Sequence, residues 1–196
     1  MARTSLIFLL LSVLYIACQA RSPTAASSRA SNFIKASCSA TKYPALCVQS
    51  LAAFAPSIQQ SPRQLAQTAL SVSLDRVKST QEFVSKMKKF KGLKKREYEA
   101  IKDCIEEMND SVDRLSKSVQ ELKHMGQAKG QDFQWHVSNV ETWVSAALTD
   151  ENTCVDGFAG RGMDGKVKAS IRDRVINVAQ VTSNALSLVN QFASKQ

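Results

Sequence analysis

The 196-residue chain has little of what breaks helices or builds common catalytic sites. It contains only four prolines, seven glycines and two histidines. Alternation of apolar and polar residues typical of strands is missing, so we expect an all-α protein. Gly-x-Ser-x-Gly, a glycine-rich phosphate loop and His-Glu-x-x-His are also missing, and His124 and His136 lie in a polar stretch. These absences indicate that the protein is not an enzyme.

One alternative keeps a hydrolase open. Acidic residues are frequent between Glu97 and Asp113, and two of them in one cleft would suit a glycosidase. Lysines and arginines are interleaved with these acids, which favours a solvated helix face over a catalytic pair.

Long hydrophobic runs are absent after the first twenty residues. Residues 1–20 have a short, positively charged start with Arg3, then an apolar run from Leu6 to Ala17, and they end in Cys18-Gln19-Ala20. This order is typical of a secretory signal peptide cleaved after Ala20, and the run is too short for a comfortable membrane span. We therefore expect a secreted protein that has no membrane contact after cleavage.

Cleavage would leave four cysteines, Cys38, Cys47, Cys104 and Cys154. An even number in an oxidising compartment predicts two disulfides. Three pairings are possible and the sequence alone does not choose among them, although the reversal expected at Thr41-Lys42-Tyr43-Pro44 favours Cys38–Cys47 and leaves Cys104–Cys154. Because the spacing matches no zinc pattern, we expect neither a metal site nor a cofactor.

Helical periodicity covers most of the chain after a small, polar stretch at residues 21–30, which we expect to be a flexible tail. Domain 31–196 would begin with a helical hairpin at 31–57. Ser61-Pro62 then resembles an N-cap followed by proline at the first helical position. The clearest seam is spaced by three and four residues: Tyr98, Ile101, Ile105, Met108, Val112, Leu115, Val119 and Leu122.

Three further stretches carry the same spacing, and glycines separate them. They centre on residues 66–84, 133–148 and 167–192, with Gly92, Gly126 and the group from Gly157 to Gly165 between helices. Four long helices with short links predict an up-down-up-down four-helix bundle at 61–195. The expected fold is thus a bundle with an N-terminal helical hairpin and two disulfides.

Three segments resemble the plant invertase and pectin methylesterase inhibitor family. They are Ile34-x-x-x-Cys38-x-x-Thr41-x-Tyr43-Pro44-x-x-Cys47-x-x-x-Leu51, then Asp103-Cys104 with Asp110-Ser111-Val112-Asp113-x-Leu115, then Trp143-Val144-Ser145-Ala146-Ala147-Leu148-Thr149 with Thr153-Cys154-x-Asp156-Gly157-Phe158. The resemblance implies a four-helix bundle, disulfides between first and second and between third and fourth cysteines, and one-to-one, non-covalent binding over the active-site cleft of an enzyme in the cell wall (apoplast).

The family has two kinds of target. Its invertase-directed members share Pro-Lys-Phe just before the third bundle helix, whereas this chain has Gln131-Asp132-Phe133. In the invertase-directed members this tripeptide enters the invertase active site, and an acid in place of the lysine suits a pocket built for a cation poorly. Pectin methylesterase is therefore the favoured partner and invertase the alternative. By analogy with the family, the expected contacts are Asp103, Glu107, Thr149, Asn152 and Thr153. A helix C-terminal cap is the other reading of Asn152 and Thr153.

Positive charge is in excess, with a formal net charge of +9. A basic cluster lies between the first two long helices: Lys86, Lys88, Lys89, Lys91, Lys94, Lys95 and Arg96. It could hold a polyanion, which outside a plant cell would be pectate, or it could complement a helix C-terminus and aid solubility. Secretion and the shortage of aromatic residues argue against nucleic acid. Asn109-Asp110-Ser111 is a predicted glycosylation acceptor.

Overall fold

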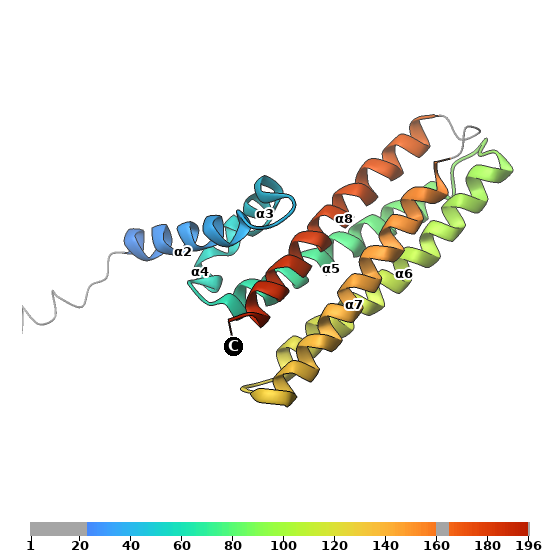
Figure 1. Cartoon of the computed structure of the whole chain (residues 1–196). Coiled ribbons are helices and arrows are strands. Elements are labelled where there is room, and N and C mark those ends of the chain that lie inside the picture. Colours follow the sequence, from blue (N-terminus) through green and yellow to red (C-terminus); the bar gives the residue numbers. More distant parts are fainter. Residues whose placement is uncertain (1–22, 160–164, 196) are drawn as a thin grey trace, which may run out of the picture.

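The computed structural model describes residues 23–159 and 165–195, and within these ranges every regular element is helical. The expected signal peptide at 1–20 lies outside them. Four long helices make up most of the chain: α5 (Pro62–Met87), α6 (Lys95–His124), α7 (Gly130–Gly157) and α8 (Lys166–Ala193). Each packs on two others, α5 on α6 and α8, and α7 on the same pair. The predicted up-down-up-down bundle is therefore confirmed (Figure 1).

Local sequence explains where α5 begins. The Ser61 side chain accepts a hydrogen bond of 3.2 Å from the backbone N–H of Gln64, and Pro62 occupies the first turn. A side-chain cap satisfies one N–H that the first turn leaves free, and proline there loses no helical hydrogen bond. Gly92 then allows the turn between α5 and α6, because its φ of +88° is in the region that favours glycine.

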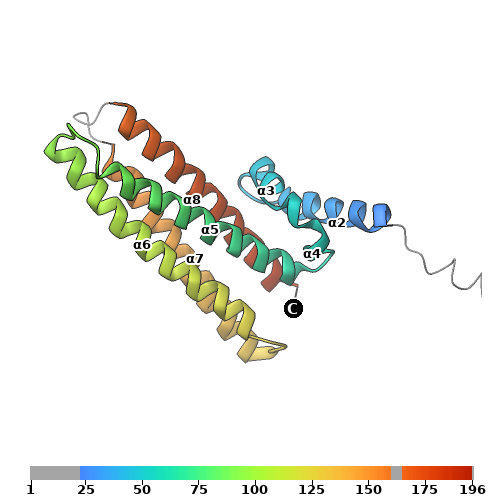
Figure 2. The ribbon, with the colours of Figure 1, turned by 180° about the vertical axis from the view of Figure 1, so that it is seen from behind.

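The N-terminal part is a compact group of shorter helices packed on α5 and α8. It contains α2 (Pro23–Cys38), α3 (Pro44–Leu51), a 3₁₀ turn η1 (Ala52–Phe54) and α4 (Ala55–Ile58). Figures 1 and 2 show α2 and α3 beside the bundle, near the end at which α8 finishes. The expected hairpin is present, and α4 and η1 complete it.

The structure differs from the expected flexible tail at residues 21–30. From Pro23 onward this stretch is the first half of α2, and Ala30 is only 3% exposed. The buried side chains of Ile34 and Cys38 hold the second half of α2 against its neighbours. Once that half is held, each further turn adds hydrogen bonds without a new nucleation step, and alanine favours its growth.

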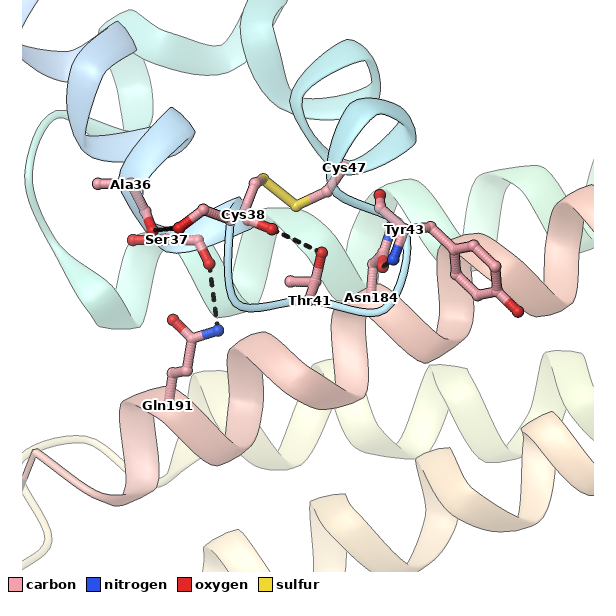
Figure 3. Close-up of a disulfide and its surroundings, with 9 residues drawn as sticks. Ala36, Ser37, Cys38, Thr41, Tyr43, Cys47, Asn184 and Gln191 are labelled. Atoms are coloured by element: carbon pink, nitrogen blue, oxygen red, sulfur yellow. Dashed lines mark hydrogen bonds between the residues drawn. A yellow bond between two sulfur atoms is a disulfide. The ribbon is translucent and has the colours of Figure 1, made fainter.

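Side-chain hydrogen bonds fix the hairpin on α8 (Figure 3). The Asn184 amide bonds both backbone groups of Tyr43: its Oδ1 accepts from N–H at 3.0 Å, and its Nδ2 donates to C=O at 2.9 Å. Farther along α8, Gln191 Nε2 donates to the carbonyl of Ser37 at 3.2 Å. The Cys38–Cys47 disulfide closes the same turn. The hairpin is thus held covalently within itself and by hydrogen bonds to the bundle.

The apolar seams form the core, with some corrections. Ile101, Met108, Leu115 and Leu122 of α6 are fully buried, as are Val140 and Val144 of α7. Of the other four expected seam residues of α6, Val119 is buried, whereas Ile105 and Val112 are half-buried and Tyr98 is 38% exposed. Cys104 and Ser111 take the central positions instead. Small side chains there let the antiparallel helices approach closely.

Candidate target-binding surface

The Cys104–Cys154 disulfide marks the middle of the surface that sequence analysis singled out. It joins α6 to α7 with Cα atoms 4.4 Å apart, and both cysteines are buried. Together with Cys38–Cys47 it confirms the expected pairing. Because this buried crosslink joins α6 to α7, the exposed edge that the two helices share is held in shape before any partner binds.

Two hydroxyls line the solvent side of α7 next to the disulfide. Thr149 and Thr153 are exposed and four residues apart, so they share one helix face. Thr149 Oγ1 donates to the carbonyl of Ser145 at 3.1 Å, and Thr153 Oγ1 donates to that of Thr149 at 2.9 Å. Each hydroxyl keeps acceptor lone pairs for a partner. Because α7 continues to Gly157, these bonds lie inside the helix and do not cap its end.

Acidic side chains line the facing side of α6. Asp103 is exposed and Glu107 half-buried. Arg114 bridges to α7, its Nε 2.8 Å from Asp150 Oδ2, while its Nη2 lies 4.0 Å from Asp110. Burial raises the pKa of Asp150 to about 6; Arg114 opposes the rise, whereas the negative charges of Glu107 and Asp110 add to it. This edge is therefore an acidic strip with one arginine, beside the two threonines.

Asn152 does not join that strip. Its Nδ2 donates to the carbonyl of Leu148 at 2.8 Å, and the residue lines a hollow between α7, α8 and the hairpin turn, opposite Tyr43. Four of the five expected contact residues therefore lie along the α6–α7 edge, and Asn152 lies on the side of α7 next to α8. The alternative expectation that Asn152 caps the C-terminus of a helix is also wrong, because α7 continues past it to Gly157.

Sequence analysis missed a buried polar layer inside the bundle. Glu151 of α7 is fully buried, and its Oε1 accepts bonds of 2.9 Å from Ser111 Oγ of α6 and Thr182 Oγ1 of α8. Thr182 also bonds Ser73 of α5 at 2.7 Å. Burial raises the pKa of Glu151 to about 8, against the lowering effect of the Ser111 and Thr182 hydrogen bonds.

The sequence did contain an indication of this layer. Glu151 falls on the seam of α7 at steps of three and four, shown by Val137, Val140, Val144, Ala147, Glu151 and Cys154. A glutamate on a core seam predicts a buried carboxyl that needs hydrogen-bond donors from neighbouring helices.

The remaining predicted positions lie elsewhere. Asn109 is exposed on α6, where its Oδ1 accepts a hydrogen bond from Gln81 of α5; its glycosylation stays a prediction. In the segment compared with Pro-Lys-Phe, Asp132 is exposed, and its Oδ1 lies 3.6 Å from His136 Nε2. Phe133 is buried, and its ring packs edge-on against that of Phe192 with the ring centroids 5.5 Å apart. The basic cluster occupies the end of the bundle at which α5 joins α6.

Neither a metal centre nor a spanning helix is found in the described parts of the chain. Their His, Cys, Asp and Glu residues form no group of three or more that could hold a metal ion. Within the same ranges, no helix combines the length and the apolar character that crossing a membrane requires.

The described residues form an all-helical bundle with two disulfides, a hairpin docked on its side and an acidic α6–α7 edge, which is the fold class of a disulfide-stapled four-helix bundle. The family model described as plant invertase/pectin methylesterase inhibitor matches residues 32–188. The chain belongs to this family.

Similar proteins agree with that assignment. The chain is 60% identical to "21 kDa protein" of Daucus carota, with 87% of this chain and 89% of the relative covered. It is 55% identical to "Pectinesterase inhibitor 11" of Arabidopsis thaliana, covering 97% and 96%. The fold resembles the crystal structure of a mutant pectin methylesterase inhibitor from Arabidopsis, with a TM-score of 0.62, 21% identity, and coverage of 78% of this chain and 92% of that one.

Proposed function

We propose that this protein is a secreted inhibitor of pectin methylesterase that limits the de-esterification of pectin in the cell wall. The observation that carries the proposal is its 55% identity, over nearly the full length of both chains, to a relative named a pectinesterase inhibitor. Inhibition would be non-covalent and one-to-one, with the α6–α7 edge lying over the active-site cleft of the enzyme so that the polymer cannot enter.

The architecture suits such a role. A partner that binds helices already fixed by disulfides orders few groups on association, so less of the interaction free energy is lost. Thr149, Thr153 and the acidic strip from Asp103 to Asp110 supply acceptors on one exposed edge. An esterase cleft that binds a polyuronate needs donors and cations for its carboxylates, and these would face the acceptors of the inhibitor.

The first turn of α7 supports pectin methylesterase over invertase as the target. Asp132 presents a carboxylate where the invertase-directed members have lysine, and it lies exposed near His136. Phe133 is buried in the bundle against Phe192, so its ring is used for packing. A pocket that accepts a lysine would meet a like-charge clash with Asp132.

The test is an inhibition assay with the purified mature chain against plant pectin methylesterase and against cell-wall and vacuolar invertases, at two pH values. We expect concentration-dependent loss of pectin methylesterase activity and unchanged sucrose hydrolysis. Titration of a known enzyme concentration gives the stoichiometry, which should be one. Inhibition of invertase alone would replace the proposal with the invertase alternative, and turnover of pectin by the protein itself would make it an enzyme.

A further inference from the structure

The basic cluster forms a continuous cationic end of the bundle, here called the basic end. It consists of the six lysines and one arginine between Lys86 and Arg96, a segment without any acidic residue. All seven side chains are exposed. No charged side-chain nitrogen of these residues lies within 4.0 Å of a carboxylate in the described ranges, although the Glu97 carboxylate accepts a hydrogen bond of 2.8 Å from the backbone N–H of Lys94. The charge of the basic end is therefore not neutralised within the described structure.

Helix stability explains only part of this charge. Lys86 lies in the last turn of α5, where a cation interacts favourably with the helix dipole. Lys94, Lys95 and Arg96 stand at the N-cap and first two positions of α6, the positive end of that dipole, where a cation is unfavourable. Helix stability therefore does not explain these three cations, although Glu97 in the same turn does satisfy the N-cap N–H.

The surroundings of the basic end are mixed in charge, because Glu97 and Glu99 follow it directly on α6, whereas the start of α8 adds no acid. Figures 1 and 2 show the start of α8 at the same end of the bundle, opposite the end near the hairpin. The first turn of α8 contains no acidic residue. Two aromatic side chains lie within or beside the basic end: Phe90 is 55% exposed, and Lys88 Nζ lies over the ring of Tyr98, 5.3 Å from its centroid. Only the Phe90 ring therefore offers an open apolar face beside these cations.

We propose that the basic end binds a linear polyuronate, the de-esterified stretches of pectin, through cations that precede the α6–α7 edge along the chain. The choice of this polyanion rests on the proposed function, because an esterase acting on pectin methyl esters and water leaves one carboxylate, one methanol and one proton at each ester. Six of the seven cations are lysines, which act as mobile point charges. Such charges suit carboxylates repeated along a flexible chain, whereas close recognition of phosphates favours the arginine fork.

Binding there would gather the inhibitor where the enzyme has already acted. The product polymer would hold the bundle by its basic end, while Asp103, the α6 residue of the α6–α7 edge nearest to that end, lies about two helical turns beyond Arg96. Tethering to the same polymer raises the concentration of inhibitor around the enzyme without changing any contact between the two proteins. The inhibitor would thus accumulate in proportion to the carboxylates that the enzyme produces.

The experiment measures binding of the full mature chain to immobilised polygalacturonate in the absence of esterase. Highly methyl-esterified pectin, single-stranded DNA and vesicles of phosphatidylserine with phosphatidylcholine serve as competing surfaces. We expect binding to polygalacturonate that weakens as salt is raised and that is lost on methyl-esterified pectin. Equal or stronger binding to DNA or to vesicles at the same charge density would overturn the assignment of the ligand.

The decisive variant is Lys94→Gln/Lys95→Gln/Arg96→Gln. Because each exposed ion contact contributes a factor of about two to three, losing three should weaken polygalacturonate binding roughly tenfold. The same change should raise the melting temperature, since it removes cations from a helix N-terminus. Weaker binding in a more stable protein separates ligand contact from damage to the fold.

A matched control removes the same charge elsewhere. Lys117→Gln/Lys123→Gln/Lys129→Gln alters three exposed lysines, none of them at the basic end. We expect it to bind polygalacturonate nearly as the parent does, and equal loss in both triple variants would show that net charge alone acts. Inhibition of pectin methylesterase is measured separately on both variants. A chain that inhibits the enzyme but does not bind the polymer refutes this inference and leaves the proposed function standing.

Discussion

Thr182 on α8 donates a hydrogen bond of 2.9 Å to Glu151 on α7, and neither side chain is exposed to solvent. Ser111 on α6 donates to the same carboxyl oxygen, and Ser73 on α5 bonds Thr182, so each bundle helix contributes one residue. A buried carboxyl without these donors would be strongly destabilising. The layer therefore favours one alignment of the four helices over alignments shifted by a turn.

Stability should fall as pH rises. Burial raises the pKa of Glu151 from 4.5 to about 8, so between these values the folded chain binds a proton that the unfolded chain has released. The stabilisation is complete below the unfolded pKa and is lost as pH rises towards about 8. Asp150, whose pKa is raised to about 6, acts in the same direction. Urea unfolding at pH 5, 6.5 and 8 should show a loss of several kcal/mol, at roughly 1.4 kcal/mol per unit of pKa shift.

Glu151→Gln tests the origin of that slope. The amide keeps the carbonyl that Ser111 and Thr182 donate to, but it does not titrate. We expect the free energy of unfolding of the variant to vary much less between pH 6.5 and 8. Glu106→Gln, an exposed glutamate on α6, is the matched control and should keep the parental slope. A parental slope in Glu151→Gln would assign the pH dependence to other groups.

Thr182→Val should destabilise the bundle by about 1–3 kcal/mol at pH 5, because a near-isosteric side chain leaves buried oxygens without their partner. Chemical denaturation measures the change. Thr149→Val is the control, since Thr149 is an exposed hydroxyl in the adjoining helix, and it should change stability by less than about 0.5 kcal/mol. Equal effects of the two changes would show that the loss comes from valine in a helix rather than from the layer.

The two disulfides should contribute unequally. Cys104–Cys154 joins residues 50 apart in the sequence, whereas Cys38–Cys47 joins residues 9 apart. In the chain-entropy model the longer loop stabilises by about 4 kcal/mol and the shorter by roughly 2.5–3 kcal/mol. Cys104→Ala/Cys154→Ala should therefore lower the free energy of unfolding more than Cys38→Ala/Cys47→Ala. The reverse order would show that the hairpin disulfide acts mainly through the native state.

Thr149→Ala/Thr153→Ala tests the contact surface of the proposed inhibitor. We expect roughly tenfold weaker inhibition of pectin methylesterase, as for contacts near the centre of an interface, with an unchanged melting curve. The control double variant Ser79→Ala/Ser170→Ala removes exposed hydroxyls from α5 and α8 and should inhibit normally. If the threonine variant inhibits as well as the parent, these two residues are not part of the interface.

Much of the fold was predictable because helices repeat their pattern over many turns. Seams such as that containing Ile101, Met108 and Leu115 indicated four long helices, and the cysteine count indicated two disulfides. Burial at single positions was less predictable: Tyr98 fits the α6 seam yet is 38% exposed. It stands in the first turn of α6, at an end of the bundle where neighbouring helices cover less of the seam.

The site was less predictable than the fold. Helical spacing placed Thr149 and Thr153 on one face, but the side of α7 that Asn152 occupies depends on where α8 and the hairpin pack. The seam position of Glu151 predicts a buried carboxyl, but which residues of the other helices donate to it depends on how those helices are aligned. The start of α2 was missed because its first half has no apolar spacing and becomes helical by extension of the packed second half.

The hydrogen bonds between Asn184 and Tyr43 have a consequence for sequence variation. Asn184 binds the main-chain N–H and C=O of residue 43 and not its side chain. Any residue that can adopt the same backbone conformation therefore satisfies that docking point, whereas position 184 needs an amide with one donor and one acceptor. The tyrosine that the family pattern has at position 43 must therefore be explained by its ring, which lines the hollow shared with Asn152, whereas asparagine at 184 is explained by the two hydrogen bonds themselves.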